Sequence, residues 1–183
     1  KTRSDTEVIL HGYEEWGTDC VSRFNGMFAF AIWDSNRQRL FIARDHLGIK
    51  PLYYTQVGSR LLFASEIKAL LEDPQCPRAV NLSALGQLFT LRFVPSPNTL
   101  FEGIHKLPPG HWMLADASGV HVERYWRWTP LRSSFQLSRV SASWAALSMM
   151  RRVQVPRASA LFQASTVYVF RRSLVLPPSL SWR

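Results

Sequence analysis

Apolar positions near the start of the chain recur at helical spacing and predict a helix over residues 4–16. Its apolar face consists of Val8, Ile9, Leu10, Tyr13 and Trp16. Ser4 and Glu7 have the spacing of a capping box, and Gly17 follows where glycine commonly ends a helix. The pattern therefore predicts both ends of this helix.

The pattern then changes to short, nearly continuous apolar runs, which predict strands. Residues 27–33 (MFAFAIW) and 40–43 (LFIA) are separated by a polar stretch and predict a hairpin. Because successive residues of a strand point to opposite faces, a continuous apolar run indicates that both faces are covered. Residues 52–55 and 61–64 predict two further strands around a turn at Gly58-Ser59.

Two short helices and a second pair of extended segments follow. Residues 66–71 and 82–89 predict the helices, the second with Asn81 as its N-cap. Beyond them the chain is rich in proline, and residues 112–115 and 120–126 predict extended segments. Strands accompanied by a few helices indicate an α+β fold.

The composition changes abruptly at residue 129. The last 55 residues contain eight Arg and no Asp, Glu, Lys or Gly, although the whole chain has 13 acidic residues and nine Gly. About one residue in eight is acidic in ordinary proteins. A stretch of this length without an acidic residue is therefore unusual. We expect residues 129–183 to be an anomalous basic tail that is not natively folded. A frame-shifted translation of a following domain would explain it.

The net charge of +9 does not predict a nucleic-acid-binding protein, because most of it belongs to this tail. In residues 1–128, 14 Lys and Arg stand against 13 Asp and Glu, which leaves about +1. No run approaches the ~20 apolar residues of a membrane span, and the first residues lack the apolar core of a signal peptide. Cys20 and Cys76 match no metal-binding spacing. We expect reduced thiols in a cytoplasmic protein that binds neither nucleic acid nor membrane.

Four segments occur in a distinctive order: residues 4–8 (SDTEV), 24–34 (FNGMFAFAIWD), 44–54 (RDHLGIKPLYY) and 64–70 (ASEIKAL). Together they resemble the class II glutamine amidotransferases, and among these the asparagine synthetases most closely. The resemblance extends over roughly residues 2–128, and residues 95–126 look like the segment that joins the two domains of those synthetases. It implies a partial N-terminal-nucleophile (Ntn) hydrolase fold, an αββα sandwich.

The resemblance also implies three parts of the chain. Residues 1–75 would be the C-terminal part of a class II glutamine amidotransferase domain. Residues 76–128 would be an interdomain segment that leads to the synthetase domain, and residues 129–183 the unassigned tail.

In the family, an N-terminal cysteine attacks the side-chain amide of glutamine, and its own α-amino group acts as the base. The ammonia passes to a synthetase domain that activates aspartate with ATP and Mg. Here residue 1 is Lys1, Cys20 has no free α-amine, and the glycine-free tail has no counterpart of the Ser-Gly-Gly-x-Asp-Ser loop that cradles pyrophosphate. We therefore expect a fragment that has no catalytic residue, cofactor or metal of its own and is inactive by itself.

One glutamine-binding residue of the family has a match. By the resemblance, Asp5 would hold the α-ammonium group of glutamine through a charge-assisted hydrogen bond. The alternative is that Asp5 only caps or charges the first helical turn. Arg44, Asp45 and Gly48 would form a structural turn rather than a catalytic loop, with Gly48 meeting a backbone requirement.

The function implied for the parent enzyme is asparagine biosynthesis: the ATP-dependent amidation of aspartate with ammonia from glutamine. Its partners would be glutamine and the synthetase domain, and the parent would form a homodimer. Two alternatives stay open. The parent could be a related amidotransferase with another acceptor, such as a polysaccharide or secondary-metabolite precursor, or the chain could be a non-catalytic remnant.

Overall fold

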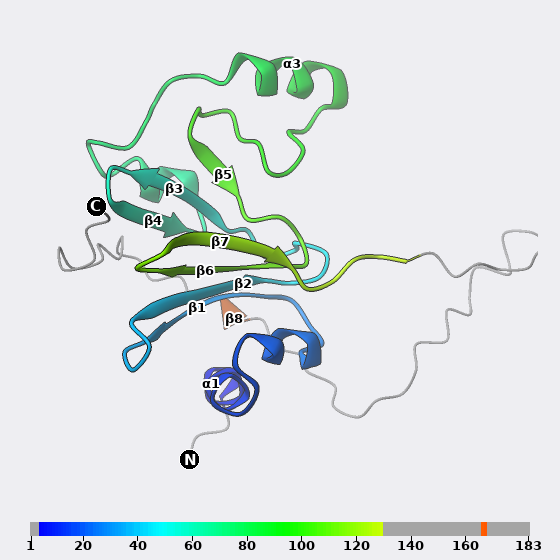
Figure 1. Cartoon of the computed structure of the whole chain (residues 1–183). Helices are drawn as coiled ribbons and strands as arrows, with labels where there is room; N and C mark the ends of the chain where they lie inside the picture. Colours follow the sequence, from blue (N-terminus) through cyan, green and yellow to red (C-terminus); the bar gives the residue numbers. More distant parts are fainter. Residues whose placement is uncertain (1–3, 130–165, 168–183) are drawn as a thin grey trace, which may run out of the picture. The chain divides into compact units, whose positions relative to one another are not determined.

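The structure, a computed structural model, describes residues 4–129 and 166–167 (Figure 1). It begins with helix α1 (Asp5–Trp16) and a 3-10 helix, η1 (Gly17–Arg23). Ser4 is the N-cap of α1 in an extended conformation, and its carbonyl accepts a hydrogen bond of 3.1 Å from the Glu7 amide. Gly17 ends α1 with a φ of 60°, a conformation that glycine adopts without steric cost.

Five strands form the larger sheet, in the order β7-β6-β2-β1-β8. Their bounds are β1 Phe28–Asp34, β2 Arg39–Arg44, β6 His111–Asp116, β7 Gly119–Arg124 and β8 Thr166–Val167. The pairs β1–β2, β2–β6 and β6–β7 are antiparallel, whereas β8 pairs parallel with β1 at Phe28 and Ala29.

Three strands form the smaller sheet, in the order β4-β3-β5, and both of its pairs are antiparallel. The strands are β3 Tyr53–Val57, β4 Arg60–Ala64 and β5 Ile104–Lys106, and helices α2 (Ile67–Leu70) and α3 (Leu82–Leu91) lie between β4 and β5 in the chain. Asn81 caps α3, because its side-chain oxygen accepts a hydrogen bond of 3.0 Å from the Ala84 amide.

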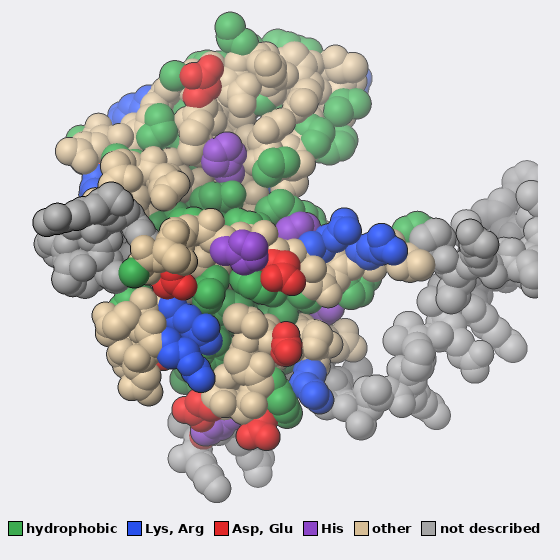
Figure 2. Space-filling model, viewed as in Figure 1, with side chains coloured by type: hydrophobic (Ala, Val, Ile, Leu, Met, Phe, Trp, Pro, Cys, Tyr) green, Lys and Arg blue, Asp and Glu red, His purple; other side chains and the backbone are tan. Residues whose placement is uncertain are grey.

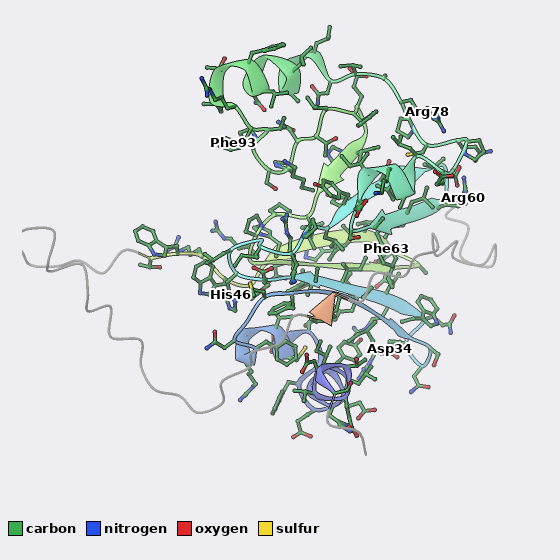
Figure 3. The ribbon with its side chains drawn as sticks, turned by 180° about the vertical axis from the view of Figure 1, so that it is seen from behind. Asp34, His46, Arg60, Phe63, Arg78 and Phe93 are labelled. Carbon is green, nitrogen blue, oxygen red and sulfur yellow. The ribbon has the colours of Figure 1, made fainter. Side chains whose placement is uncertain are left out.

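The main core lies between the two sheets. Ala29, Leu40 and Ile42 of the larger sheet belong to the same buried cluster as Leu61 and Phe63 of the smaller one (Figure 3). These residues occupy alternate positions on their strands, as side chains that share one face of a sheet must.

The residues between them face outward and are covered as well. Phe30 and Phe41 pack with Tyr13 of α1 and with Val21 of η1 on the outer face of the larger sheet. On the outer face of the smaller sheet, a third cluster joins strand residues Leu62, Ala64 and Ile104 to α2 and the segment after it, through Leu70 and Cys76. Covering of both faces explains why the strand sequences are continuously apolar.

The predicted helices and both predicted hairpins are confirmed, and antiparallel sheets with a few helices confirm the α+β class. The predicted capping box is wrong in one respect: Ser4 is the N-cap of α1, but its hydroxyl makes no capping hydrogen bond. Strand β5 was not predicted: three residues with only Ile104 buried carry no periodicity. None of the helices in the described ranges is long and apolar enough to cross a membrane.

The predicted interdomain segment, residues 76–128, contributes strands to both sheets. In it, β5 pairs with β3, and β6 pairs with β2. The predicted boundary after residue 75 thus falls within one unit whose first stretch is residues 1–127, and a division there would separate paired strands. The predicted tail, residues 129–183, lies outside the described residues except for Thr129 and β8.

Candidate functional site

The Asp45 carboxylate organises the turn that follows β2. Its oxygens accept hydrogen bonds from the amides of Leu47 at 3.1 Å, Ile49 at 3.0 Å and Lys50 at 2.9 Å. The Asp45 side chain is only 1% exposed, and its backbone amide donates to the Phe28 carbonyl at 2.8 Å. One buried carboxylate therefore fixes the path of five residues relative to the start of β1.

The neighbouring Arg44 closes the same turn from the other side. Its guanidinium donates to three backbone carbonyls, those of Lys50 at 2.7 Å, Gly48 at 2.7 Å and Leu107 at 2.6 Å. Burial lowers the pKa of the Arg44 guanidinium from its ordinary value, and the negative charge of Asp45 opposes that change. The side chain joins the turn to the segment that leads into β6.

Glycines allow these segments to approach closely. Gly48 has a φ of 66°, and a Cβ at this position would lie 2.7 Å from Cγ of Pro109. Gly110 has a φ of 65°, and its Cβ would lie 2.6 Å from the Trp126 carbonyl oxygen. The Gly110 amide donates to the Asp45 carbonyl at 2.9 Å. Both positions therefore need glycine, for backbone conformation and for space.

Aromatic side chains complete this cluster. The Tyr125 hydroxyl donates to the Arg44 carbonyl at 2.8 Å, and burial, with the Asp45 charge adding to it, raises the Tyr125 pKa. His46 lies edge-on to the rings of Phe28, Tyr125 and Trp126, at centroid distances of 6.2, 5.4 and 5.1 Å. Burial lowers the pKa of His46, whose position Figure 3 labels. We call these residues together the pinned turn: Arg44–Lys50, Leu107–Gly110, Tyr125 and Trp126.

The cysteines do not resemble activated nucleophiles. Cys20 lies in η1 with 0% exposure, and burial raises its pKa to about 11. Cys76 is also free and buried. A thiol attacks as the thiolate, which is scarce at neutral pH when the pKa is that high. Within residues 4–129 and 166–167, no three His, Cys, Asp or Glu side chains converge as metal ligands would.

Asp5 belongs to a different element from the pinned turn. It is the first residue of α1, is half-buried, and carries a negative charge in the first helical turn together with Glu7. The unpaired amides of a helix N-terminus favour a carboxylate at this place. The position of Asp5 therefore depends on how firmly α1 is held against the larger sheet.

A polar tether holds α1 at the far end of β1. The Tyr13 hydroxyl donates to the Asp34 carboxylate at 2.9 Å, and Arg39 donates to the Tyr13 oxygen at 3.0 Å. Asp34 also accepts from the backbone amides of Asn36 and Arg37, at 3.1 and 3.0 Å. Burial acts to raise the pKa of Asp34, but these hydrogen bonds and the Arg37 charge outweigh it, so the pKa lies below its ordinary value of 3.8.

This tether predicts a pH-dependent contribution to stability. Because the folded-state pKa of Asp34 is lowered, its contribution is present above about pH 4 and is lost as the pH falls through the folded-state pKa. We expect Asp34→Asn to lower the free energy of unfolding by about 1–2 kcal/mol at pH 7. Urea unfolding at pH 7, 5 and 3.5 should show the difference from the unchanged chain shrinking only at the lowest pH. An equal difference at all three would contradict the role given to the carboxylate.

The sequence itself matches known proteins across the described part of the fold. The family model described as the glutamine amidotransferase domain matches residues 1–126. The chain belongs to this family. The resemblance drawn from the four sequence segments is thereby confirmed. The match ends beyond β7, so α1, both hairpins, β5 and the pinned turn all lie within the glutamine amidotransferase domain.

Similar proteins of this family include asparagine synthetases. The chain is 48% identical to asparagine synthetase [glutamine-hydrolyzing] 3 of Bacillus subtilis over 124 residues. These residues are 67% of this chain and 20% of the relative. Asparagine synthetase [glutamine-hydrolyzing] 2 of the same organism is 44% identical over 118 residues, 62% of this chain and 16% of the relative. The amidase chyE of Penicillium rubens is 36% identical over 124 residues, which are 67% of this chain and 18% of the relative. The chain thus spans about a fifth of the length of these relatives.

The structure brings together three of the four residues predicted for the site. Arg44, Asp45 and Gly48 share the pinned turn, whereas Asp5 comes from α1. Sequence reasoning missed the contribution of Leu107, Gly110 and the Tyr125 hydroxyl. The Pro-Pro-Gly at 108–110 was the available signal, because such a sequence marks a fixed turn.

Proposed function

We propose that this glutamine amidotransferase domain serves a glutamine-dependent asparagine synthetase. In this proposal, glutamine is hydrolysed at the amidotransferase domain, and a separate synthetase region uses the ammonia, with ATP and Mg, to amidate aspartate. The names of the Bacillus subtilis relatives support it. Two face-to-face sheets with helices outside them are also what an Ntn hydrolase αββα sandwich would require.

Asp5 carries the substrate-binding part of the proposal. Asp5 is the first residue of α1, and the tether of Tyr13 to Asp34 fixes this helix on the sheet. A carboxylate held in this way can pair with the α-ammonium group of glutamine, and a charge-assisted hydrogen bond of that kind is stronger than a neutral one.

A graft tests the proposal in a full-length enzyme. The stretch of the Bacillus subtilis asparagine synthetase 3 that matches this chain would be replaced by the corresponding residues of this chain. We expect the graft to hydrolyse glutamine and to form asparagine. In the graft, Asp5→Asn should raise the KM for glutamine by about 10- to 100-fold, the loss expected for one charge-assisted hydrogen bond.

The same variant should leave asparagine synthesis from added ammonia unchanged, because ammonia bypasses the glutamine site. Glu7→Gln is the matched control, since it removes a charge from the same helical turn. Equal effects of Asp5→Asn and Glu7→Gln on the KM would contradict direct binding of glutamine by Asp5. Asp5 would then act only through its charge at the helix N-terminus. A graft that folds but does not hydrolyse glutamine would refute the proposed function.

A second candidate rests on the match to an amidase. The Penicillium rubens relative is named an amidase, which favours a different acceptor. The chain would then supply ammonia for the amidation of a carboxylic acid other than aspartate. Because the acceptor would bind outside the amidotransferase domain, replacing aspartate by other carboxylic acids in the assay of the graft would not discriminate the two candidates, whereas the coding sequence downstream of this domain would.

A further inference from the structure

Large apolar side chains are exposed on and beside α3. Leu82 is 74% exposed, Phe89 79% and Phe93 60%, although such side chains are usually buried. Val80 and Leu91 are about half exposed in the same region. Figure 2 shows several hydrophobic side chains at the surface around α3, in the upper part of the view, and Figure 3 labels Phe93 near the end of this helix.

These residues form a stripe rather than a scatter. Leu82, Gly86 and Phe89 are spaced by four and three residues, so they share one face of the helix. Phe93 follows the left-handed residue Arg92 that ends the helix, and extends the exposed apolar surface beyond it. The other face of α3 packs on the chain, where Ala84 is 0% exposed. Apolar positions at this spacing are the way in which a helix inserts into a groove of a partner. We call Leu82, Gly86, Phe89 and Phe93 the α3 stripe.

Within the described part of the chain, neither backbone conformation nor packing requires a glycine at position 86, in the middle of the stripe. A Cβ added there would meet no heavy atom within 4 Å, and its φ is not in the region that favours glycine. By contrast, a Cβ at Gly12, the glycine inside α1, would lie 3.0 Å from the Phe24 ring. Glycine inside a helix is unfavourable relative to other residues, so Gly86 suggests that another backbone or side chain approaches this point closely.

The charge pattern around the stripe favours burial. Residues 80–101 contain a single charged residue, Arg92. Burial of this surface would therefore remove few charges from water, and the desolvation of charges is the main cost of covering a protein surface. Exposed apolar patches of this kind mark interaction sites in soluble proteins.

We propose that the α3 stripe is the surface on which the amidotransferase domain docks the synthetase region of the same polypeptide. This inference rests on the proposed function. The relatives carry about four-fifths of their length outside the matched region, so an occupant of sufficient size is available in one chain. The partner surface would be apolar, with a backbone segment or small side chain opposite Gly86.

The size of the stripe favours a tethered partner over a second copy of the chain. A specific complex between free proteins needs about 1,200–2,000 Å² of buried surface, whereas contacts between domains of one chain are stable with about 600 Å² or more. Tethering raises the effective concentration of the partner to about the millimolar range, which compensates for a small interface. One exposed helix face fits the second case.

Site-specific labelling tests the burial directly. Phe89→Cys and, as a control, Lys68→Cys would be introduced into the full 183-residue chain and into the full-length graft described above. Lys68 is a suitable control because its side chain on α2 is 83% exposed. Labelling by a maleimide, read at each site by peptide mass spectrometry, should slow on the order of tenfold or more at position 89 in the graft and remain unchanged at position 68.

A second variant separates docking from folding. Gly86→Gln replaces glycine by a better helix former in open space, so in the 183-residue chain it should leave the melting temperature unchanged or raise it. In the graft the longer side chain should obstruct the docked partner and restore fast labelling of Phe89→Cys. Ser83→Gln, at an exposed position of the same helix outside the stripe, should not.

The outcomes distinguish this inference from the proposed function. Protection at position 89 in a graft that makes asparagine from ammonia but does not hydrolyse glutamine would refute the function and support the docking surface. A graft active with glutamine in which position 89 labels as fast as in the 183-residue chain would overturn the docking surface. Protection in the 183-residue chain that grows with its concentration would overturn it as well, in favour of a second copy.

Discussion

Replacing Asp45 by Asn is expected to lower the free energy of unfolding by about 3 kcal/mol. The carboxylate accepts three backbone amides in a site with almost no access to water. An Asn side chain has one acceptor oxygen, and its NH₂ group would point at an amide donor. The variant also removes the negative charge that opposes the desolvation of the Arg44 guanidinium. Urea unfolding of the 183-residue chain, followed by tryptophan fluorescence, measures the loss.

Asp116→Asn is the matched control for this prediction. Asp116 also accepts hydrogen bonds in a turn, at 2.8 Å from the Ser118 amide and at 2.6 Å from its hydroxyl, but that turn is open to solvent. The same substitution there should cost about 1 kcal/mol or less, because water can replace a lost partner. If the two variants lost the same stability, burial of the pinned turn would not be what makes Asp45 important.

The local elements were predictable because each is specified by neighbouring residues. Gly17 ends α1 and Asn81 begins α3, and each of these roles depends on one residue and the adjacent backbone. The hairpin of β1 and β2 follows from two apolar runs separated by a polar turn. None of these features needs a contact from a distant part of the chain.

The pinned turn was predictable only in part, since its contacts span long separations in sequence. Arg44 donates to the Leu107 carbonyl, 63 residues away, and accepts from the Tyr125 hydroxyl, 81 residues away. A carbonyl partner leaves no trace in the sequence, because every residue has one. The resemblance to a family predicted a structural role for Arg44 and Asp45, but the atoms to which they bind are known only from the structure.

The placement of residues 76–128 shows the same limit. This stretch contains five prolines and has the composition of a linker, yet its strands β5 and β6 pair with β3 and β2. Sheet membership is decided by strands more than 45 residues earlier in the chain. Periodicity predicts that a segment is extended but not which strand it pairs with.

Phe41→Ala is expected to have the largest effect on stability, about 3–5 kcal/mol. The Phe41 ring is 0% exposed, stacks on Tyr13 of α1 at 5.3 Å, and contacts the rings of Phe30 at 5.9 Å and Trp112 at 6.1 Å. Its removal leaves a cavity between α1 and the larger sheet. Because α1 carries Asp5, the variant should also raise the KM for glutamine when it is placed in the graft.

Phe63→Ala separates these two effects. Phe63 is buried between the two sheets, in a cluster that does not include α1, so its truncation should cost comparable stability without moving Asp5. At a temperature where both grafted variants are folded, only Phe41→Ala should raise the KM for glutamine. An equal rise in both would mean that general loosening of the fold, rather than the seat of α1 on the larger sheet, controls glutamine binding.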